Sequence, residues 1–249
     1  MNLGPYDFGY TWPWTHGHLV VAIPFALGAL AAWRLRWAWW LRALFATVTL
    51  WAVVAFVVVQ AAGGYYQPVD LPTGRFMQSN TGQVLDVGCG SGRAAVGVLK
   101  ARPGVTLVAL DNFSADYIAG NGPDLLRRNL RAGGVEARLT RIVSADMRQI
   151  PLDDGTFDGV ISTYAIDHVN REGSAQTVKE VARVLRPGGE FLLLIMRADW
   201  RLRLAYPLPH LHVGGRGDQW WRTTLEAQGF DIVEQGTRPA TTYFYARKR

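Results

Sequence analysis

A glycine-rich turn between an apolar strand and a helix constrains this 249-residue chain most strongly. In the stretch QVLDVGCGSGRAAV (residues 83–96), an apolar segment carries Asp86 and is followed by Gly88, Gly90 and Gly92. Glycine lets the main chain approach a ligand closely, and the helix that follows offers free N–H groups. The turn therefore predicts a ligand held against the backbone between a strand and a helix.

Strand and helix signals alternate from residue 83 onward. We expect strands at 83–88, 105–111, 137–146, 157–166 and 190–196. The helical stretches include 92–102, a run that ends near Arg131 and could begin with Asp124 as its N-cap, and 174–185, which the turn RPGG follows. This order predicts an α/β fold with a mostly parallel, doubly wound sheet, in which ligands lie at the carboxyl ends of the strands.

Acidic residues follow three successive predicted strands. Asp111 ends the second strand, where a carboxylate can accept hydrogen bonds from ribose hydroxyls. Asp146 ends the third and could accept from an exocyclic amine, while Met147 could flank a ring. The glycine spacing is G-x-G-x-G, not the G-x-G-x-x-G of dinucleotide sites, and a third acid suits a single adenosine better than a dinucleotide.

Taken as a set, VLDVGCGSGR, VALD, SADMRQIPLDDGTFDGVIS and VARVLRPGGEFLLL resemble the ordered motifs of class I S-adenosylmethionine-dependent methyltransferases of the small-molecule or lipid type. The resemblance covers about residues 83–196, and the tail fits the antiparallel last strand of that Rossmann-like fold. It implies S-adenosylmethionine as the cofactor, with the loop 86–92 on its methionine part, Asp111 on the ribose, and Asp146 with the Met147 backbone on the adenine. The residues expected at the cofactor are Asp86, Gly88, Cys89, Gly90, Gly92, Asp111, Asn112, Ala145, Asp146, Met147 and Tyr164.

The segment STYAIDHVN follows the fourth predicted strand and should face the transferred methyl group. Asp167 and His168 are candidates for a base or a substrate anchor, and Tyr164 is a further substrate-side candidate. A histidine at this position can also serve packing alone. Methyl transfer from a sulfonium mainly requires a nucleophile held in line and dry, so few catalytic side chains are needed.

The insertion 197–221 lies between the fifth strand and the last helix, where chains that resemble this one often carry a substrate lid. His210 and His212 share one face if the segment is extended, and His168 could join them at a metal. Two histidines in a surface loop are far commoner than a metal site, so we expect no metal. Cys89 is the single cysteine, which excludes a disulfide framework, and we interpret it as a packing residue.

The first 62 residues are a hydrophobic segment that contains seven of the ten tryptophans. The stretch 43–62 is 20 residues long without a charge, enough for a helix that crosses a bilayer. The stretch 19–33 is shorter, and Pro24 interrupts it. Together the two stretches predict a helical hairpin. The alternatives are a buried core helix for 43–62 and a signal peptide for 19–33. We divide the chain into this membrane hairpin (1–62), a linker (63–82) and the methyltransferase domain (83–249).

The turn between the two apolar stretches carries Arg34, Arg36 and Arg42. The positive-inside rule would place these arginines in the cytoplasm and the C-terminal domain outside. The cofactor is made inside cells, so we expect the domain on the cytoplasmic side of the membrane instead. The hairpin then either crosses the membrane with both ends in the cytoplasm or rests in one leaflet, and both arrangements violate the charge rule. The net charge of +6 comes without a dense basic run, which favours anionic lipid over nucleic acid as the partner.

These observations predict a membrane-anchored methyltransferase for a small or lipophilic acceptor. The acceptor could be a phospholipid amine, a quinone-like phenol or a lipophilic thiol. One alternative is a non-catalytic membrane scaffold that binds S-adenosylmethionine, and another is a nicotinamide or nucleotide-sugar enzyme on a similar sheet. The oligomeric state is left open.

Overall fold

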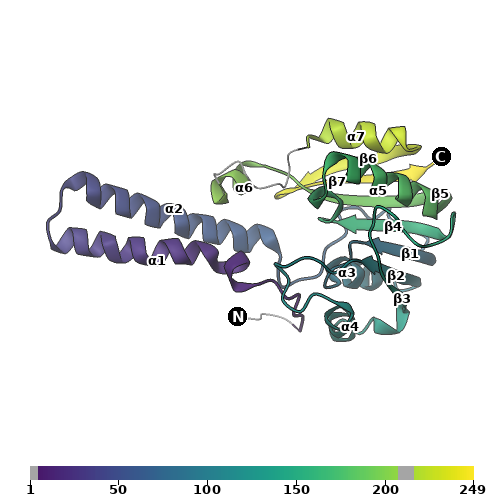
Figure 1. Ribbon diagram of the computed structural model, residues 1–249, viewed down its shortest axis with the longest axis horizontal. Helices are drawn as coiled ribbons and strands as arrows, with labels where there is room; N and C mark the ends of the chain where they lie inside the picture. The colour runs from purple at the N-terminus through teal and green to yellow at the C-terminus, as the bar shows by residue number, and fades with distance from the viewer. Residues whose placement is uncertain (1–4, 207–215) are drawn as a thin grey trace.

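The computed structural model describes residues 5–206 and 216–249 and has two parts, a long helical hairpin and an α/β body (Figure 1). The hairpin consists of α1 (Trp12–Arg34) and α2 (Trp39–Gly63). The body contains β1 (Gly82–Val87), α3 (Arg93–Ala101), β2 (Val105–Asp111), α4 (Pro123–Ala132), β3 (Leu139–Ser144), β4 (Phe157–Thr163), α5 (Arg171–Val184), β5 (Leu185–Met196), α6 (Trp200–Ala205), α7 (Asp218–Ala227), β6 (Phe230–Arg238) and β7 (Thr241–Lys248). Two short 3-10 helices, η1 (Glu136–Arg138) and η2 (Ile166–His168), precede β3 and follow β4.

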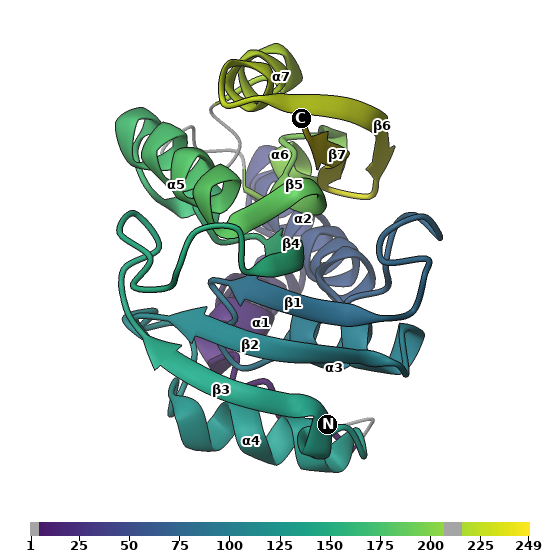
Figure 2. The same ribbon diagram turned by 90° about the vertical axis from the view of Figure 1, so that its right-hand side faces the viewer.

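The seven strands form one sheet in the order β3-β2-β1-β4-β5-β7-β6. Strands β1 to β5 pair in parallel, while β7 is antiparallel to both β5 and β6. Helices α3 and α4 cover one face, and α5 and α7 cover the other (Figure 2). The predicted doubly wound fold with an antiparallel last strand is confirmed. The strand order reverses between β1 and β4, which is where such sheets bind ligands.

The segment before the hairpin is part of the body's core. In this N-terminal strap (residues 5–11), the side chains of Tyr6 and Phe8 are buried against the α3 face of the sheet. The backbone N–H of Asp7 donates to Asn129 Oδ1, and Asn129 Nδ2 donates back to the Asp7 carbonyl, at 3.0 and 2.8 Å. The strap therefore fixes the start of α1 to the body.

The hairpin is arranged with small residues inside and large apolar residues outside. The buried residues of α2 are Ala52, Ala55 and Val59, and α1 buries Ala22 and Ala32. The exposed set on the two helices and the turn between them is Trp12, Val20, Ile23, Leu27, Leu30, Trp33, Leu35, Trp37, Trp39, Trp40, Leu44, Leu50, Val53, Val54 and Val57. Among the described residues, α1 and α2 are the two helices long and apolar enough to cross a membrane.

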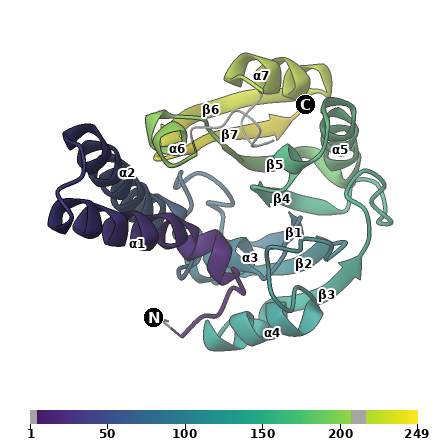
Figure 3. The ribbon, with the colours of Figure 1, turned by 60° about the vertical axis from the view of Figure 1, so that its left-hand side comes forward.

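Helix α6 joins the hairpin to the body (Figure 3). Trp51 Nε1 donates to the Leu204 carbonyl at 2.8 Å, and a ring nitrogen of His18 lies 2.8 Å from the Ala205 carbonyl. The last carbonyls of a helix have no partner within it, so two hairpin side chains satisfy groups that α6 leaves free. On the body side, Asp199 accepts from the backbone N–H of Ala240, just before β7.

Three local expectations were wrong. Pro24 does not interrupt α1, which continues through it for 23 residues, because a single missing backbone donor in a long helix is tolerable. Asp124 lies in the first turn of α4 and not at its N-cap, since Pro123 already occupies the first helical position after Gly122. The RPGG turn falls within β5, whose register against β4 shifts there.

Candidate functional site

The glycine-rich loop has the backbone that the sequence predicted. Gly88, Gly90 and Gly92 have φ values of 75°, 47° and 90°, a region that residues with a side chain rarely adopt. A Cβ on Gly88 would collide with the side chain of Ala165, which follows β4. The loop therefore packs closely against the end of β4 and leaves its backbone facing the space above β1.

Asp86 is a buried acid without a hydrogen-bond partner in the described part of the chain. Its side chain is fully buried at the end of β1, and both carboxylate oxygens lack a donor at hydrogen-bonding distance. Burial, together with the negative charge of Asp111, raises its pKa from 3.8 to about 8. A carboxyl in such a place therefore keeps its proton at neutral pH unless a cation completes the site. Asp86 itself does not line the cavity, but Gly88 and Cys89 just after it do. A ligand ammonium, such as the one on the methionine part of the expected cofactor, could reach it only from that side.

Asp111 lies across from this acid at the end of β2. Its Oδ2 accepts from the Gly90 N–H at 2.7 Å and its Oδ1 from the Phe113 N–H at 2.6 Å. Burial raises its pKa, and these backbone donors oppose the shift. Each carboxylate oxygen has a second lone pair that can accept from a hydroxyl. The neighbouring residue Asn112 lines the same cavity.

The end of β3 differs in detail from the expectation. Ala145 and Met147 line the cavity, whereas Asp146 is held by Arg148, whose Nη2 lies 2.6 Å from Asp146 Oδ2. This ion pair lowers the pKa of Asp146. The structure thus places Ala145 and Met147, on either side of Asp146, at the cavity. The Asp146 carboxylate itself pairs with Arg148, and not with a ligand amine as the sequence suggested.

A single cavity of about 420 Å³ connects the strand ends to the hairpin. One wall is the glycine loop with the ends of β2 and β3, and the opposite wall comes from the bases of α1 and α2 and from α6. The lining residues contributed by α1, α2 and α6 are Trp14, Val58, Val59, Ala62, Gly63, Arg201, Leu202 and Ala205. The space that could hold a cofactor is therefore continuous with the hairpin.

Aromatic rings line the side of the cavity that faces the hairpin. Tyr10 comes from the strap, Trp14 from α1, Tyr65 from the segment after α2, and Tyr117 from the segment after β2. The sequence analysis missed all four as site residues, since nothing in their local pattern separates them from other aromatic residues. Only the fold brings them together.

Tyr164 stands at the carboxyl end of β4 with a strained backbone. Its φ is 52°, uncommon for a residue with a side chain, and its hydroxyl lies 2.8 Å from Thr241 Oγ1 at the start of β7. The ring lines the cavity, as the sequence analysis expected of a cofactor or substrate contact. Such strain persists where surrounding structure holds it, often at a functional site.

The two catalytic candidates after β4 occupy different places. His168 lines the cavity with an exposed ring that stacks on Tyr117. Asp167 is buried behind it and does not line the cavity; its Oδ2 accepts from the Met196 N–H at 2.8 Å. Burial raises the pKa of Asp167, and the neighbouring His168 opposes the shift. Asp167 therefore orders the ends of β4 and β5, while His168 can reach a ligand.

The remaining candidates bear on metal and thiol chemistry. His210 and His212 lie outside the described residues. Among residues 5–206 and 216–249, no cluster of three metal-ligating side chains occurs. Cys89 is buried in the glycine loop, and burial, followed by the charges of Asp86 and Asp111, raises the pKa of its thiol well above the ordinary value. A thiol in that state is a packing residue and not a nucleophile.

Comparison with known proteins agrees with this geometry. A family described as "Methyltransferase domain" matches residues 84–189. Sterol 4-C-methyltransferase strm-1 of Caenorhabditis elegans is 26% identical over 165 residues, covering 59% of this chain and 46% of the relative. Ubiquinone/menaquinone biosynthesis C-methyltransferase UbiE of Geobacter sulfurreducens is 34% identical over 117 residues, covering 47% and 42%. The chain thus matches less than half the length of these curated relatives.

Solved structures show the same fold. An O-methyltransferase family 2 protein of Planctomyces limnophilus, solved in complex with apigenin, aligns with a TM-score of 0.57 at 18% identity. The alignment covers 80% of this chain and 62% of that one.

Proposed function

The chain carries a class I S-adenosylmethionine-dependent methyltransferase domain, and we propose that the whole protein is a membrane-anchored enzyme that methylates a small, lipophilic acceptor. The observation that carries this proposal is the shared cavity. Its cofactor side is built by the methyltransferase domain and its other side by the base of the apolar hairpin. An acceptor that reaches the methyl group there must touch both.

The unpaired carboxylate and the open glycine backbone support a site for S-adenosylmethionine. We assign Asp86 to the ammonium of its methionine part, the loop 88–92 to the main-chain contacts, and Asp111 to the ribose hydroxyls. Ala145 and Met147 flank the adenine end. The bound cofactor supplies an electrophilic methyl group, so the chain's own task is to orient an acceptor and exclude water.

The hairpin's inverted pattern supports a membrane as its surroundings. Two helices in water would bury their leucines and tryptophans, whereas α1 and α2 bury small residues such as Ala22, Ala32 and Ala52 and expose the large side chains. Membrane helices associate in this way, because small residues allow close packing while lipid solvates the rest. Gly28 fits the same pattern, since a Cβ there would overlap the Phe45 ring.

The short free part of the hairpin supports a body that lies close to the membrane surface. From His18, where α6 is attached, to Arg34 the helix rises about 24 Å, and from Trp39 to Trp51 about 18 Å. The hydrocarbon core is about 30 Å thick. The arginines at the turn add several ångströms of reach, so the α1 leg approaches this thickness while the α2 leg remains shorter than it. We place the body on the cytoplasmic side, where the cofactor is made, with the arginine turn on the opposite side.

The experiment that tests this function shortens the hairpin without disturbing the body. Deleting residues 1–62 would also remove the buried strap, so we would replace residues 19–50 with a short Gly/Ser linker that joins His18 to Trp51. The rings of these two residues lie 6.0 Å apart, which makes the join easy. A matched control replaces the same residues with a Leu/Ala hairpin of equal length.

All three proteins are given labelled S-adenosylmethionine and vesicles of the total lipids of the organism that carries the gene. We expect the shortened variant to bind S-adenosylhomocysteine like the full chain but to lose transfer to lipid, and the Leu/Ala control to keep both. Equal transfer by the shortened variant would remove the membrane from the mechanism. A full chain that binds S-adenosylhomocysteine and labels no lipid would be a non-catalytic scaffold.

A further inference from the structure

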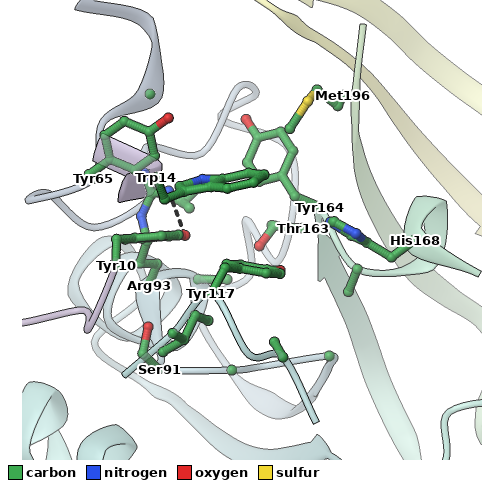
Figure 4. A pocket seen from close by; sticks show the side chains of 18 of the residues that line it. Tyr10, Trp14, Tyr65, Ser91, Arg93, Tyr117, Thr163, Tyr164, His168 and Met196 are labelled. Atoms are coloured by element: carbon green, nitrogen blue, oxygen red, sulfur yellow. Dashed lines mark hydrogen bonds between the residues drawn. The ribbon is translucent and has the colours of Figure 1, made fainter. Parts of the chain in front are cut away.

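The rings around Tyr117 share nearly one orientation (Figure 4). The planes of Tyr10, Trp14 and His168 lie within 15°, 23° and 22° of the Tyr117 ring, with centroid distances of 6.3, 5.2 and 5.9 Å. A box for a tetrahedral ammonium presents ring faces from several steep directions. Rings of similar orientation instead form a row that a flat aromatic guest extends by offset stacking.

The charges on the cavity wall disfavour a phospholipid headgroup. Among the described lining residues, the two cationic side chains other than histidine are Arg93 and Arg201. Arg93 donates to the Gln67 carbonyl and to the Tyr10 hydroxyl, at 3.1 and 3.3 Å, and its guanidinium lies over the Tyr10 ring. A phosphate would have to displace these contacts.

Arg201 is engaged in the same way, since it pairs with Asp199 at 3.0 Å. The one carboxylate on the described wall, Asp111, is bound by backbone N–H groups on the cofactor side. An ammonium head would therefore lie near two guanidinium groups with no acid of its own. The described wall offers no free acid for an ammonium, and both arginines already have partners, which favours an uncharged headgroup.

His168 is the group on this wall that can accept a proton. Its exposed ring ends the row at Tyr117, and no described residue hydrogen-bonds to its ring nitrogens. Because the ring is exposed, a proton taken up there can pass to solvent. Imidazole is the commonest general base in proteins, and a phenol needs one because its pKa of about 10 keeps it protonated at neutral pH.

We propose, on the basis of the proposed function, that the acceptor is a lipid with a flat phenolic headgroup and that His168 removes its proton. The ring stacks on Trp14, which itself stacks on Tyr117, and the apolar tail leaves past Val58, Val59 and Leu202 toward the membrane. The phenolic proton goes to the imidazole, and a lone pair of the oxygen forms the new bond to the methyl carbon. The bond from sulfur to that carbon breaks with its electron pair left on sulfur.

The first test compares headgroups on identical tails. The full chain in lipid nanodiscs is given labelled S-adenosylmethionine and an alkylphenol, a phosphatidylethanolamine or an alkylthiol. We expect transfer to the phenol alone. Transfer to the amine or the thiol, and not to the phenol, would overturn this inference while the proposed function stands. If none of the three headgroups and no native lipid is methylated, both the inference and the proposed function are overturned.

The second test measures acceptor binding apart from turnover. With S-adenosylhomocysteine bound, Trp14→Ala should weaken equilibrium binding of the alkylphenol about tenfold and Trp14→Phe much less, because the phenyl ring still stacks. Trp12→Ala is the matched control, since Trp12 is exposed on α1 and stacks on His16 outside the cavity. Equal weakening by the Trp12 and Trp14 variants would contradict the stacking surface.

The third test separates a base from a packing residue. His168→Asn should lower kcat by about 10²- to 10⁴-fold at pH 7 with little change in KM. Its rate should then rise about tenfold per pH unit toward the phenol's pKa of about 10, because the substrate ionises without help. A variant that stays slow at every pH, or one that equals the wild type, would refute the assignment of His168 as the base.

Discussion

The hairpin and the body use the same kinds of side chain in opposite ways. In the body, Leu85, Leu99 and Leu107 are completely buried, whereas Leu27 in α1 is 63% exposed and Trp39 in α2 is 76% exposed. Burial of apolar surface stabilises the body in water at about 25 cal/mol per Å². The hairpin can gain the same free energy only from an apolar solvent.

The boundary between the two regions is the cavity. Polar contacts gather there, such as the bond from Trp51 to the Leu204 carbonyl and the one between Gln60 and the Thr15 carbonyl. Farther along the hairpin the two helices meet through small apolar residues. The hairpin therefore also forms one wall of the cavity.

Equivalent core and hairpin substitutions should differ most. Leu99→Ala leaves a cavity in the α3 face and should cost about 2–5 kcal/mol of unfolding free energy. Leu27→Ala removes a side chain that contacts little protein, and should change the unfolding free energy by less than about 0.5 kcal/mol. Urea titrations in one detergent would measure both. Similar losses would mean that the hairpin face is covered by protein.

A charge in the hairpin should act on membrane binding instead of folding. Leu27→Lys places an ammonium near the middle of α1, at a cost of about 2.5–3.5 kcal/mol for insertion. We expect less of this variant in the carbonate-resistant membrane fraction. Val233→Lys, at a partly exposed apolar site on β6, is the control and should stay membrane-bound. Full retention of Leu27→Lys would contradict a lipid-facing α1.

Asp86 gives a pH-dependent prediction for the body. Its pKa is about 8 in the folded protein against an ordinary 3.8, so the folded form holds the proton more tightly than the unfolded chain. The ligand-free protein therefore loses stability as the pH rises from about 4 to about 8, and no more from this group above that. The side chain of Asp86→Asn cannot ionise, so the stability of this variant relative to wild type should rise over the same pH window, by roughly a few kcal/mol of unfolding free energy. The Tm of the variant should rise relative to the wild-type Tm accordingly.

The same variant should bind S-adenosylhomocysteine more weakly. Loss of the bond between the carboxylate and an ammonium costs about 1.5–3 kcal/mol, which calorimetry would register as a weaker Kd. Unchanged affinity would remove Asp86 from the cofactor site. A relative Tm that does not vary with pH would show that the carboxyl is not protonated in the folded protein.

The smallest effect concerns the attachment of α6. Trp51→Phe keeps an aromatic ring but loses the hydrogen bond to the Leu204 carbonyl, which contributes about 0.5–1.5 kcal/mol. Hydrogen exchange of the backbone amides of α6 should become faster, by up to about tenfold. Trp39→Phe at the exposed tip is the control. Unchanged exchange would mean that α6 is held by the body alone.

Local signals were sufficient for the fold and for the glycine loop. The run VLDVGCGSGR contains its own strand, turn and helix start, because φ above zero demands glycine and apolar runs demand burial. Asp146 shows where such reasoning stops, since its partner Arg148 is two residues away and competes with any ligand for the carboxylate. The sequence pattern does not tell whether the Asp146 carboxylate binds Arg148 or a ligand.

The hairpin shows the same limit. Its apolar length was evident, but Pro24 within a continuous α1 depends on neighbouring turns that tolerate one missing hydrogen bond. The role of the N-terminal strap was also hidden, because Tyr6 and Phe8 are isolated aromatic residues until α3 and α4 cover them. Their burial is a property of contacts distant in sequence.

The amino-acid pattern was enough to predict the elements and the chemistry that each can carry: an apolar hairpin, a glycine loop and acids at strand ends. That Trp14, Tyr117 and His168 form one row, and that α2 lines the same cavity as the glycine loop, follows from the three-dimensional fold. The physical reason is that backbone conformation and burial are set by neighbouring residues, whereas a binding surface depends on distances between segments that meet only after folding.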